Sequence, residues 1–382
     1  MRFPEFTGEW VKCKLGEIMS YSKDRVSTNS LSDENYVSTE NMLPNFGGIC
    51  RANNVPSNNS AIVYHTRNIL LSNIRPYLKK VWLANNNGGC SSDVFVLKAD
   101  NEQCDSDFLF YLVANDNFIS YVMSGAKGVK MPRGDKEQIK KYLLSLPLKD
   151  EQHKIAEFLC KLDARISTQI RVIEDLQSLK KAITNFIIDK LIKAIPLTQF
   201  AEIYIKAGEG GTPDTTKHEY YKEGTIPFIK IDDLCNKYLT EHKDNITELG
   251  LQKSSAWVVP AKSLIYSNGA TIGAISINTY PVATKQGILG IVPKQNVDVE
   301  YLYYLMTSTY FNKQVHRIII HGTMATAYLK DINKIKVSIP TLQEQQSITK
   351  LLSAISKKEE MEHSLLSHLN TQKQYLLQQM FI

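Results

Sequence analysis

Two long segments of the chain carry apolar residues at spacings of three and four, the period of an α-helix. The first begins at Asp150, which stands where an N-cap would, and continues to about Leu191. The stripes contain Ile155, Leu159, Leu162, Ile166, Ile173, Leu176 and Ile183 in the first segment, and Ile348, Leu352, Ile355, Leu366, Leu369 and Leu376 in the second. Gln169, Lys180, Glu359, Glu362 and Lys373 interrupt them. Because each stripe is too narrow for a globular core, we expect the two helices to pack on each other.

The segments that precede these helices have a different pattern. Short runs rich in β-branched and aromatic residues alternate with clusters of Asn, Gly and Pro, which predicts strands and turns. The runs are AIVY, ILLSNI and VFVL in the first segment and IPFIKI, SLIYSN and ILGIVP in the second. Two further runs, DFLFYLVAND and VEYLYYLMTST, have helical spacing, so we expect each to cover one face of a sheet.

The chain contains an internal repeat. LLSLPLKDEQHKIAEFL (143–159) aligns with KVSIPTLQEQQSITKLL (336–352), which places Pro147 and Pro340 193 residues apart. The same separation relates Gln152 to Gln345 and extends upstream to DSDFLFYL and DVEYLYYL. The sequence therefore predicts one duplicated α+β unit. Its parts are a mixed body at 1–149, a helix at 150–193, a second mixed body at 194–340 and a second helix at 341–382.

Connectivity constrains how these parts are arranged. The first helix leads directly from one body into the other, and about 40 residues at 1.5 Å each give it a length of about 60 Å. The second helix can bury its stripe against the first only by running back alongside it. We therefore expect an antiparallel coiled-coil pair that holds two bodies apart with approximate two-fold symmetry.

Composition and the cysteine pattern narrow the class of protein. Hydrophobic residues make up 43% and charged residues 22% of 382 residues, as in an ordinary globular protein. No run of about 18 apolar residues occurs, and MRFPEFTGEW has an acid and a proline where a secretory signal is basic and then apolar. We therefore expect a cytoplasmic protein without a membrane partner. The six cysteines lack CxxC spacing, so neither a zinc site nor a disulfide framework is expected.

The distribution of charge is more informative than the net charge of +6. Acidic residues are absent from Asn41–Ser92 in the first copy and from Leu249–Val297 and Tyr301–Lys330 in the second. SGAKGVKMPRGDKEQIKK adds a basic stretch to the first copy. A buried strand with a few solvated lysines would explain any one stretch, but recurrence in both copies favours a surface that faces phosphates. The candidate DNA contacts are Arg75, Lys79, Lys80, Lys127, Lys130 and Arg133 in the first copy and Lys230, Lys285, Arg317, His321 and Thr323 in the second.

Catalytic signatures are largely missing from the sequence. The acidic or Asn residue followed by Pro-Pro and an aromatic, typical of adenine-N6 methyltransferases, does not occur, and no glycine-rich nucleotide loop follows a strand. No histidine pair has a spacing that places two metal ligands on one helical face. A metal-nuclease pattern can be drawn through Asp214, Glu241 and Lys243, which leaves a single-chain DNA nuclease as one alternative. A scaffold that binds only proteins is another.

Several longer segments resemble the specificity subunit of type I restriction-modification enzymes. They are RFPEFTGEWVKCKLGEI, LPLKDEQHKIAEFLCKLDARI, IPTLQEQQSITKLL and LLQQMFI, and the resemblance covers nearly the whole chain. In the second body, GGTPDTTKHEYYKEGTIPFIKIDDL, SLIYSNGATIGAISI and ATKQGILGIVP are similar to the target-recognition domain of that family.

The resemblance implies a non-catalytic reader of double-stranded DNA. Each target-recognition domain would read one half of a bipartite, asymmetric site, and the helices would set the gap between halves and dock two modification (methyltransferase) subunits. Those subunits bind S-adenosylmethionine and methylate adenine, while restriction subunits use ATP and Mg for translocation and cleavage; no cofactor is implied for this chain. Leu162-Asp163 matches the family, whereas Ile355-Ser356 departs from it, which implies an acidic contact on one side only.

Overall fold

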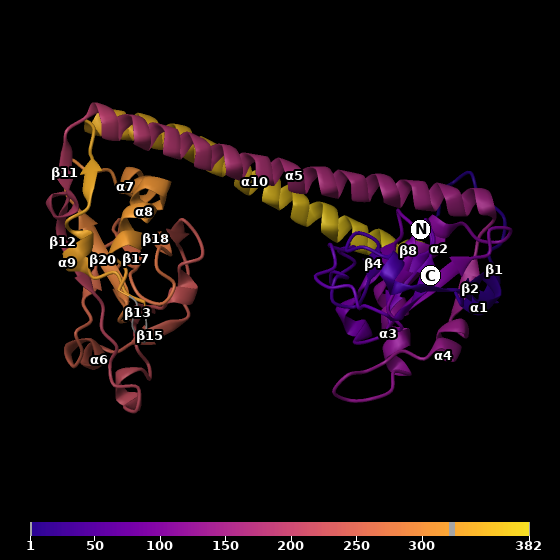
Figure 1. Cartoon of the computed structure of the whole chain (residues 1–382). Helices are drawn as coiled ribbons and strands as arrows, with labels where there is room; N and C mark the ends of the chain where they lie inside the picture. The colour runs from indigo at the N-terminus through magenta and orange to yellow at the C-terminus, as the bar shows by residue number, and fades with distance from the viewer. Residues whose placement is uncertain (1, 321–324, 382) are drawn as a thin grey trace. The chain divides into compact units, whose positions relative to one another are not determined.

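The structure, a computed structural model, describes residues 2–320 and 325–381 (Figure 1). The chain forms two compact units. Unit 1 comprises Met1–Arg171 and Ser364–Ile382, and unit 2 comprises Val172–His363. Two long helices belong to both units: α5 (Lys149–Ala194) begins in unit 1 and ends in unit 2, and α10 (Leu342–Met380) does the reverse. Asp150 lies in the first turn of α5, so the prediction that it caps this helix is wrong.

Unit 1 contains the first ten strands. They are β1 (Val11–Lys14), β2 (Met19–Tyr21), β3 (Arg25–Ser27), β4 (Tyr36–Val37), β5 (Ser60–Tyr64), β6 (Ile69–Ser72), β7 (Val81–Leu83), β8 (Gly88–Cys90), β9 (Val94–Ala99) and β10 (Leu143–Leu146). Its short helices are α1 (Leu15–Ile18), α2 (Ser106–Val113), α3 (Asp116–Ser124) and α4 (Lys136–Lys140). The strands pair in the orders β2-β9-β6-β7, β3-β5-β8-β4 and β1-β10.

Unit 2 contains the remaining strands and short helices. The strands are β11 (Leu197–Gln199), β12 (Tyr204–Glu209), β13 (Ile226–Ile229), β14 (Tyr238–Leu239), β15 (Asp244–Ile246), β16 (Val258–Val259), β17 (Leu264–Ser267), β18 (Ile275–Asn278), β19 (Val282–Thr284), β20 (Ile288–Pro293) and β21 (Lys336–Ser338). The helices are α6 (Glu248–Gln252), α7 (Val299–Thr307), α8 (Thr309–Ile318) and α9 (Leu329–Ile332). The strands pair in the orders β12-β20-β17-β18-β14, β15-β13-β19-β16 and β11-β21.

The predicted duplication is confirmed by the order of elements. In unit 1 a strand is followed by three helices, a strand and a long helix (β9-α2-α3-α4-β10-α5), and in unit 2 β20-α7-α8-α9-β21-α10 repeats that order. All six strand predictions coincide with strands, namely β5, β6 and β9 in unit 1 and β13, β17 and β20 in unit 2. The two helical runs form α2 and α7, so the predicted α+β class is confirmed.

The central strand of each unit is buried on both faces. Every residue of β6 and of β17 is buried. Alternate side chains point to opposite faces of a strand. Accordingly, Ile69 and Leu71 join a core cluster with Phe108 of α2, whereas Leu70 packs with Tyr64 on the other side. In unit 2, Leu264 and Tyr266 pack toward α7, and Ile265 enters a separate cluster. A sheet covered on both faces gives each unit a rigid scaffold for the loops at its edges.

A buried glutamine at the start of each long helix fixes that helix to its unit. Gln152 Oε1 accepts a hydrogen bond from the Asp105 backbone at 2.8 Å, and Gln345 Oε1 accepts one from Asp298 at 2.8 Å. Asp105 and Asp298 in turn cap α2 and α7 through their carboxylates. The glutamine shared by the two repeats in the sequence therefore has the same structural role in both.

The N-terminal segment packs against the start of α5. Arg2 donates two hydrogen bonds to the buried Glu151 carboxylate, at 2.7 and 2.8 Å, and Trp10 Nε1 donates a third at 3.2 Å. Phe3 packs edge-on against Phe158 with ring centroids 5.9 Å apart. Glu344, which corresponds to Glu151, is exposed and accepts hydrogen bonds from Thr341 instead. The repeat is therefore not symmetric at this position.

The antiparallel pairing of the long helices is confirmed within each unit. In unit 1, Asp163 of α5 pairs with Lys373 of α10 at 2.6 Å. In unit 2, Lys180 of α5 pairs with Glu359 of α10. Since the α5 residue number rises while that of its α10 partner falls, the helices run in opposite directions. These ion pairs account for three of the polar residues that interrupt the stripes.

The six cysteines are all free thiols. Burial raises the pKa of the Cys90 and Cys104 thiols to about 12, which makes both unreactive at neutral pH. Within residues 2–320 and 325–381, no helix combines the length and apolarity needed to cross a membrane.

Candidate nucleic-acid interface

Four of the candidate DNA contacts in unit 1 meet at one loop. We call residues 126–134, between α3 and α4, the basic loop. Lys127 and Arg133 exchange backbone hydrogen bonds at 2.9 Å and close its base, while Lys130 lies between them. The Arg75 backbone N–H donates to Pro132 O at 2.8 Å, which brings Arg75 to the same place. The basic loop thus combines two segments more than fifty residues apart in sequence.

The hydrogen-bonded bridges at the base of the basic loop, which we call the joint, also form in unit 2. Ile320 and Thr326 form the bridge that corresponds to Lys127 and Arg133, and Gly269 pairs with Thr326 as Ile74 pairs with Arg133. His321 and Thr323, two candidate contacts, lie outside the described residues. The two units therefore form the same bridges at corresponding positions although the side chains differ.

A Ser-Asn pair at the end of each central strand anchors this joint. Ser72 Oγ donates to Ile74 O and Ser267 Oγ donates to Gly269 O, each at 3.0 Å. The Asn73 carbonyl accepts from Gly134 N at 3.0 Å, and the Asn268 carbonyl accepts from Ala327 N at 2.8 Å. The residues that follow, Arg75 and Ala270, both adopt left-handed backbone conformations, with φ of 51° and 35°. This anchor was not predicted from the sequence, although ILLSNI and SLIYSN share the dipeptide Ser-Asn.

Carboxylates pair with several of the candidate cations. Lys79 pairs with Asp116 at 2.7 Å, Lys127 with Asp135 at 2.9 Å and Arg133 with Asp93 at 3.3 Å. Lys230 pairs with Asp244 at 2.8 Å. The side-chain hydrogen bond from Lys127 and the backbone N–H groups of Gln138 and Glu137 lower the pKa of Asp135 to about 2. Asp135 therefore remains ionised and keeps capping α4 at any pH at which DNA would be bound.

Five candidate cations have no carboxylate partner among residues 2–320 and 325–381. Lys80 and Arg317 contact a carbonyl and an amide oxygen instead. Arg75 and Lys130 at the basic loop and Lys285 in unit 2 make no side-chain hydrogen bond in that part of the chain. Lys285 and Lys230 lie together, because they follow the neighbouring parallel strands β19 and β13 and the Lys285 N–H donates to Ile229 O at 3.0 Å. Arg317 lies apart from them on α8 and contacts Gln314 at 3.4 Å.

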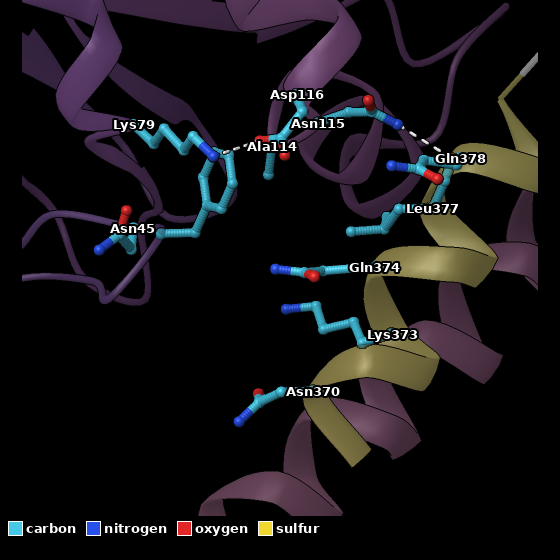
Figure 2. A pocket seen from close by; sticks show the side chains of 11 residues that line it. Asn45, Lys79, Ala114, Asn115, Asp116, Asn370, Lys373, Gln374, Leu377 and Gln378 are labelled. Carbon is cyan, nitrogen blue, oxygen red and sulfur yellow. Dashed lines mark hydrogen bonds and ion pairs between the residues drawn. The ribbon is translucent and has the colours of Figure 1, made fainter. Parts of the chain in front are cut away.

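Lys79 and Lys80 do not join the basic loop. Lys80 Nζ donates to Thr39 O at 2.6 Å. Figure 2 shows Lys79 pointing toward Asp116, beside a cavity of about 510 Å³ that Asn45 and Lys373 of α10 also line. Asn115 closes part of this region by donating from Nδ2 to Leu377 O at 3.0 Å. The cavity is therefore part of the junction between the body of unit 1 and the end of α10.

The acidic residue that distinguishes the two helix repeats is engaged inside unit 1. Asp163 accepts a hydrogen bond from Tyr111 at 2.9 Å in addition to its ion pair with Lys373. The corresponding Ser356 lies 3.4 Å from the Tyr304 hydroxyl. Asp163 therefore ties α2 to the two long helices.

The residues predicted to lie on the helix stripes are all buried or partly buried. Another set of apolar side chains on the same helices is exposed. Phe158 of α5 and Leu351 of α10, which are 193 residues apart and correspond in the repeat, are 38% and 49% exposed. Val172 and Leu365, another corresponding pair, are 36% and 38% exposed. Each helix thus carries exposed apolar side chains at corresponding positions.

The residues of the nuclease alternative lie in two separate connections of unit 2. Asp214 accepts hydrogen bonds from the Thr216 backbone and hydroxyl at 3.0 and 2.7 Å. Glu241 and Lys243 lie in the connection between β14 and β15. In the part of the chain that the structure describes, no group of three or more His, Cys, Asp or Glu residues is placed to hold a metal ion.

Sequence comparison matches both repeats to a single family model. Residues 7–176 and 190–371 match the model described as Type I restriction modification DNA specificity domain. The specificity subunit of the type I restriction enzyme MjaVIII of Methanocaldococcus jannaschii is 25% identical, with 93% of this chain and 87% of the relative covered. The HindI specificity subunit of Haemophilus influenzae is 22% identical over 87% and 90%. The MjaIX subunit is 31% identical, but over only 38% of this chain and 34% of its own length.

Solved structures support the same fold. A chain from a study of complex assembly and conformational transition in a type I restriction-modification system has a TM-score of 0.63 at 17% identity, with 98% of both chains covered. The S subunit from M. genitalium has a TM-score of 0.57 at 17% identity, with 100% of this chain and 99% of the other covered.

Proposed function

The chain belongs to the type I restriction-modification DNA specificity family, and on this premise we propose that units 1 and 2 each read one half of a bipartite, asymmetric DNA site. The observation that carries the proposal is the joint repeated in both units. In each, the Asn carbonyl of a Ser-Asn pair at the end of the central strand accepts a hydrogen bond from the segment that leads into α4 or α9, and in unit 1 the loop before that segment is basic. A fixed scaffold with different loop side chains suits two readers of different half-sites.

The cations whose side chains make neither an ion pair nor a hydrogen bond in the described part of the chain are the strongest candidates for phosphate contacts. Arg75, Lys130 and Lys285 can bind phosphate without breaking an ion pair. Lys79, Lys127, Arg133 and Lys230 would have to share or exchange a carboxylate, which reduces the net gain in free energy. Lys80, Arg317, His321 and Thr323 complete the proposed contacts.

We assign the long helices two roles. The antiparallel pair sets the gap between the half-sites, because α5 is one continuous helix of 46 residues. Its exposed apolar residues, which include Phe158 and Leu351, dock two modification subunits at corresponding places. The subunits that methylate adenine would bring S-adenosylmethionine, and restriction subunits would bring ATP and Mg, so this chain would need no cofactor. The complex would act on DNA in the cytoplasm.

This proposal makes the chain a non-catalytic reader of DNA. The family match favours it over a nuclease that uses Asp214, Glu241 and Lys243, and the basic loop favours it over a scaffold that binds only proteins.

Salt-dependent DNA binding tests the proposal. The full chain would be used to select duplexes from a random pool. Affinity for them would then be measured between 50 and 200 mM salt, because phosphate contacts determine how strongly affinity falls over this range. Lys130→Ala should weaken binding about fivefold and lower the slope of log K against log salt by about 1, because one phosphate contact is lost. Lys12→Ala, which removes an exposed lysine of β1, is the control and should change neither value. An unchanged slope for folded Lys130→Ala and Arg75→Ala variants would overturn the assignment of the basic loop.

A further inference from the structure

The tip of the basic loop carries apolar side chains in an exposed position. Val129 is fully exposed, at 103% of its reference area, and Met131 is 47% exposed. Both lie within four residues of Lys127, Lys130 and Arg133. A single exposed apolar residue needs no explanation. Here, however, two exposed apolar side chains lie at the tip of a loop that carries three cations. The cations could bind phosphates on either side of the apolar tip.

The loop is held firmly at its base. Besides the Lys127–Arg133 bonds, Pro132 O accepts from Arg75 N at 2.8 Å and Gly134 N donates to Asn73 O at 3.0 Å. The chain turns at Gly128, whose φ of 92° is open to glycine at low cost. Figure 1 shows the connection between α3 and α4 extending away from the sheets of unit 1. The apolar tip is therefore presented on an ordered base, so that little ordering entropy opposes its use in binding.

We propose that Val129 and Met131 form a wedge that inserts between stacked bases in the half-site bound by unit 1 and unstacks them. The inference rests on the proposed DNA-reading function and adds to it an active deformation of the DNA. Apolar side chains inserted at a base step cost a few kcal/mol of stacking, which contacts around the step repay. Lys127, Lys130 and Arg133 can supply such contacts to the flanking phosphates. An unstacked step also lowers the cost of extruding a base, which any enzyme that modifies that base requires.

DNA suits this tip better than a protein surface does. A protein-binding patch has an apolar centre from which charges are depleted. Here three cations lie within the same nine residues as the two apolar side chains. The positions that correspond in unit 2, Gly322 and Met324, lie outside the described residues, so the proposal concerns unit 1.

Permanganate oxidation, which attacks unstacked thymines, tests the wedge. The full chain would be bound at saturation to the selected duplexes, and reactivity would be mapped at every thymine on both strands. We expect thymines at one step of one half-site to react at least tenfold faster in the complex than in free duplex. Val129→Ala with Met131→Ala should reduce this enhancement about tenfold while weakening binding less than threefold. Val129→Ile, which keeps an apolar tip, should retain the enhancement.

The control is Val11→Ala, the same truncation at another exposed valine of unit 1, which is 66% exposed on β1. It should change neither reactivity nor affinity. If the wild-type complex has no hyperreactive thymine, or the double variant keeps it, the wedge is wrong while DNA reading stands. If the chain binds no duplex at any salt concentration, the proposed function itself fails. A double variant that still binds DNA but no longer assembles with a modification subunit would assign the tip to a protein contact instead.

Discussion

In unit 2, Lys237 and Glu300 form an ion pair where β14, α7 and α10 meet. Lys237, at the start of β14, donates to Glu300 of α7 at 2.9 Å, to Tyr304 at 3.1 Å and to Ser353 of α10 at 3.1 Å. Burial raises the pKa of Glu300, but hydrogen bonds from Tyr238, Lys237 and Ser353 outweigh burial, so the pKa falls below its ordinary value of 4.5. The ionised form of Glu300 therefore stabilises unit 2.

This pairing predicts a pH dependence of stability. Because the pKa of Glu300 is lower in the folded state than in the unfolded state, its contribution is present above pH 4.5 and is lost as the pH falls through the folded-state pKa. Glu300→Gln should lower the free energy of unfolding by about 1 kcal/mol at pH 7 and by less at pH 3. Urea unfolding at both pH values measures the difference. An equal loss at the two pH values would show that the charge of Glu300 does not matter.

The candidate site was only partly predictable at this scale. Arg75 lies in an acid-free stretch and residues 127–133 lie in a separate basic stretch, and the fold brings the two together. The stretches could not reveal that Asp93, one residue beyond Ser92, pairs with Arg133, or that Asp116 pairs with Lys79. Those pairs depend on tertiary contacts, which linear charge patterns do not contain. The Ser-Asn anchor was not predicted because its hydrogen-bond partners are backbone groups, which the residue types in a sequence do not identify.

Among the elements, the long helices were the most predictable, because an apolar stripe at spacings of three and four has few other interpretations. The polar residues within the stripes were harder to interpret. Lys180 and Glu359 are 179 residues apart in sequence, and only the antiparallel register shows that they are partners. Three of the five breaks, Lys180, Glu359 and Lys373, therefore belong to ion pairs between the helices, whereas Glu362 pairs with Lys358 of its own helix.

Two neighbouring leucines of α10 differ in exposure, and this difference predicts different effects of their substitution. Leu352 is 1% exposed and Leu351 is 49% exposed. Leu352→Ala should lower the free energy of unfolding by about 3 kcal/mol, because it leaves a cavity in a packed region, whereas Leu351→Ala should change it by less than about 0.5 kcal/mol. Leu351→Ala should instead weaken binding of a modification subunit about tenfold, as loss of an anchor side chain does.

Denaturant titration and a pull-down with the purified modification subunit measure these two effects separately. Equal destabilisation by both variants would mean that Leu351 is structural. Wild-type assembly by a stable Leu351→Ala variant would remove the exposed face from the docking proposal.

At the level of the whole molecule, duplication is the feature from which the functional proposal follows. One chain contains two scaffolds that share the order strand, three helices, strand and long helix, joined by a helix that belongs to both units. The asymmetries include the helix starts, where Arg2 holds Glu151 in unit 1 and Glu344 is exposed in unit 2, and the bridges at the loop base, where Lys127 and Arg133 correspond to Ile320 and Thr326. The two readers can therefore diverge in their loops while the common scaffold stays the same.

The proposal that the helix pair acts as a ruler, setting the gap between the half-sites, predicts that helix length can change without changing the bases that are read. Asp163–Lys373 and Lys180–Glu359 lie on either side of Glu174, so a position near Leu365 faces it in the antiparallel register. Seven residues inserted at both positions would keep each stripe on its face and lengthen the pair by about 10 Å, or about three base pairs. The half-sites should stay unchanged while the gap grows, as mapped by adenine methylation in the reconstituted complex. The same insertion in α5 alone should instead put α5 out of register with α10 and weaken folding, because Lys180 loses Glu359. A map with altered half-sites and the original gap would exclude the ruler.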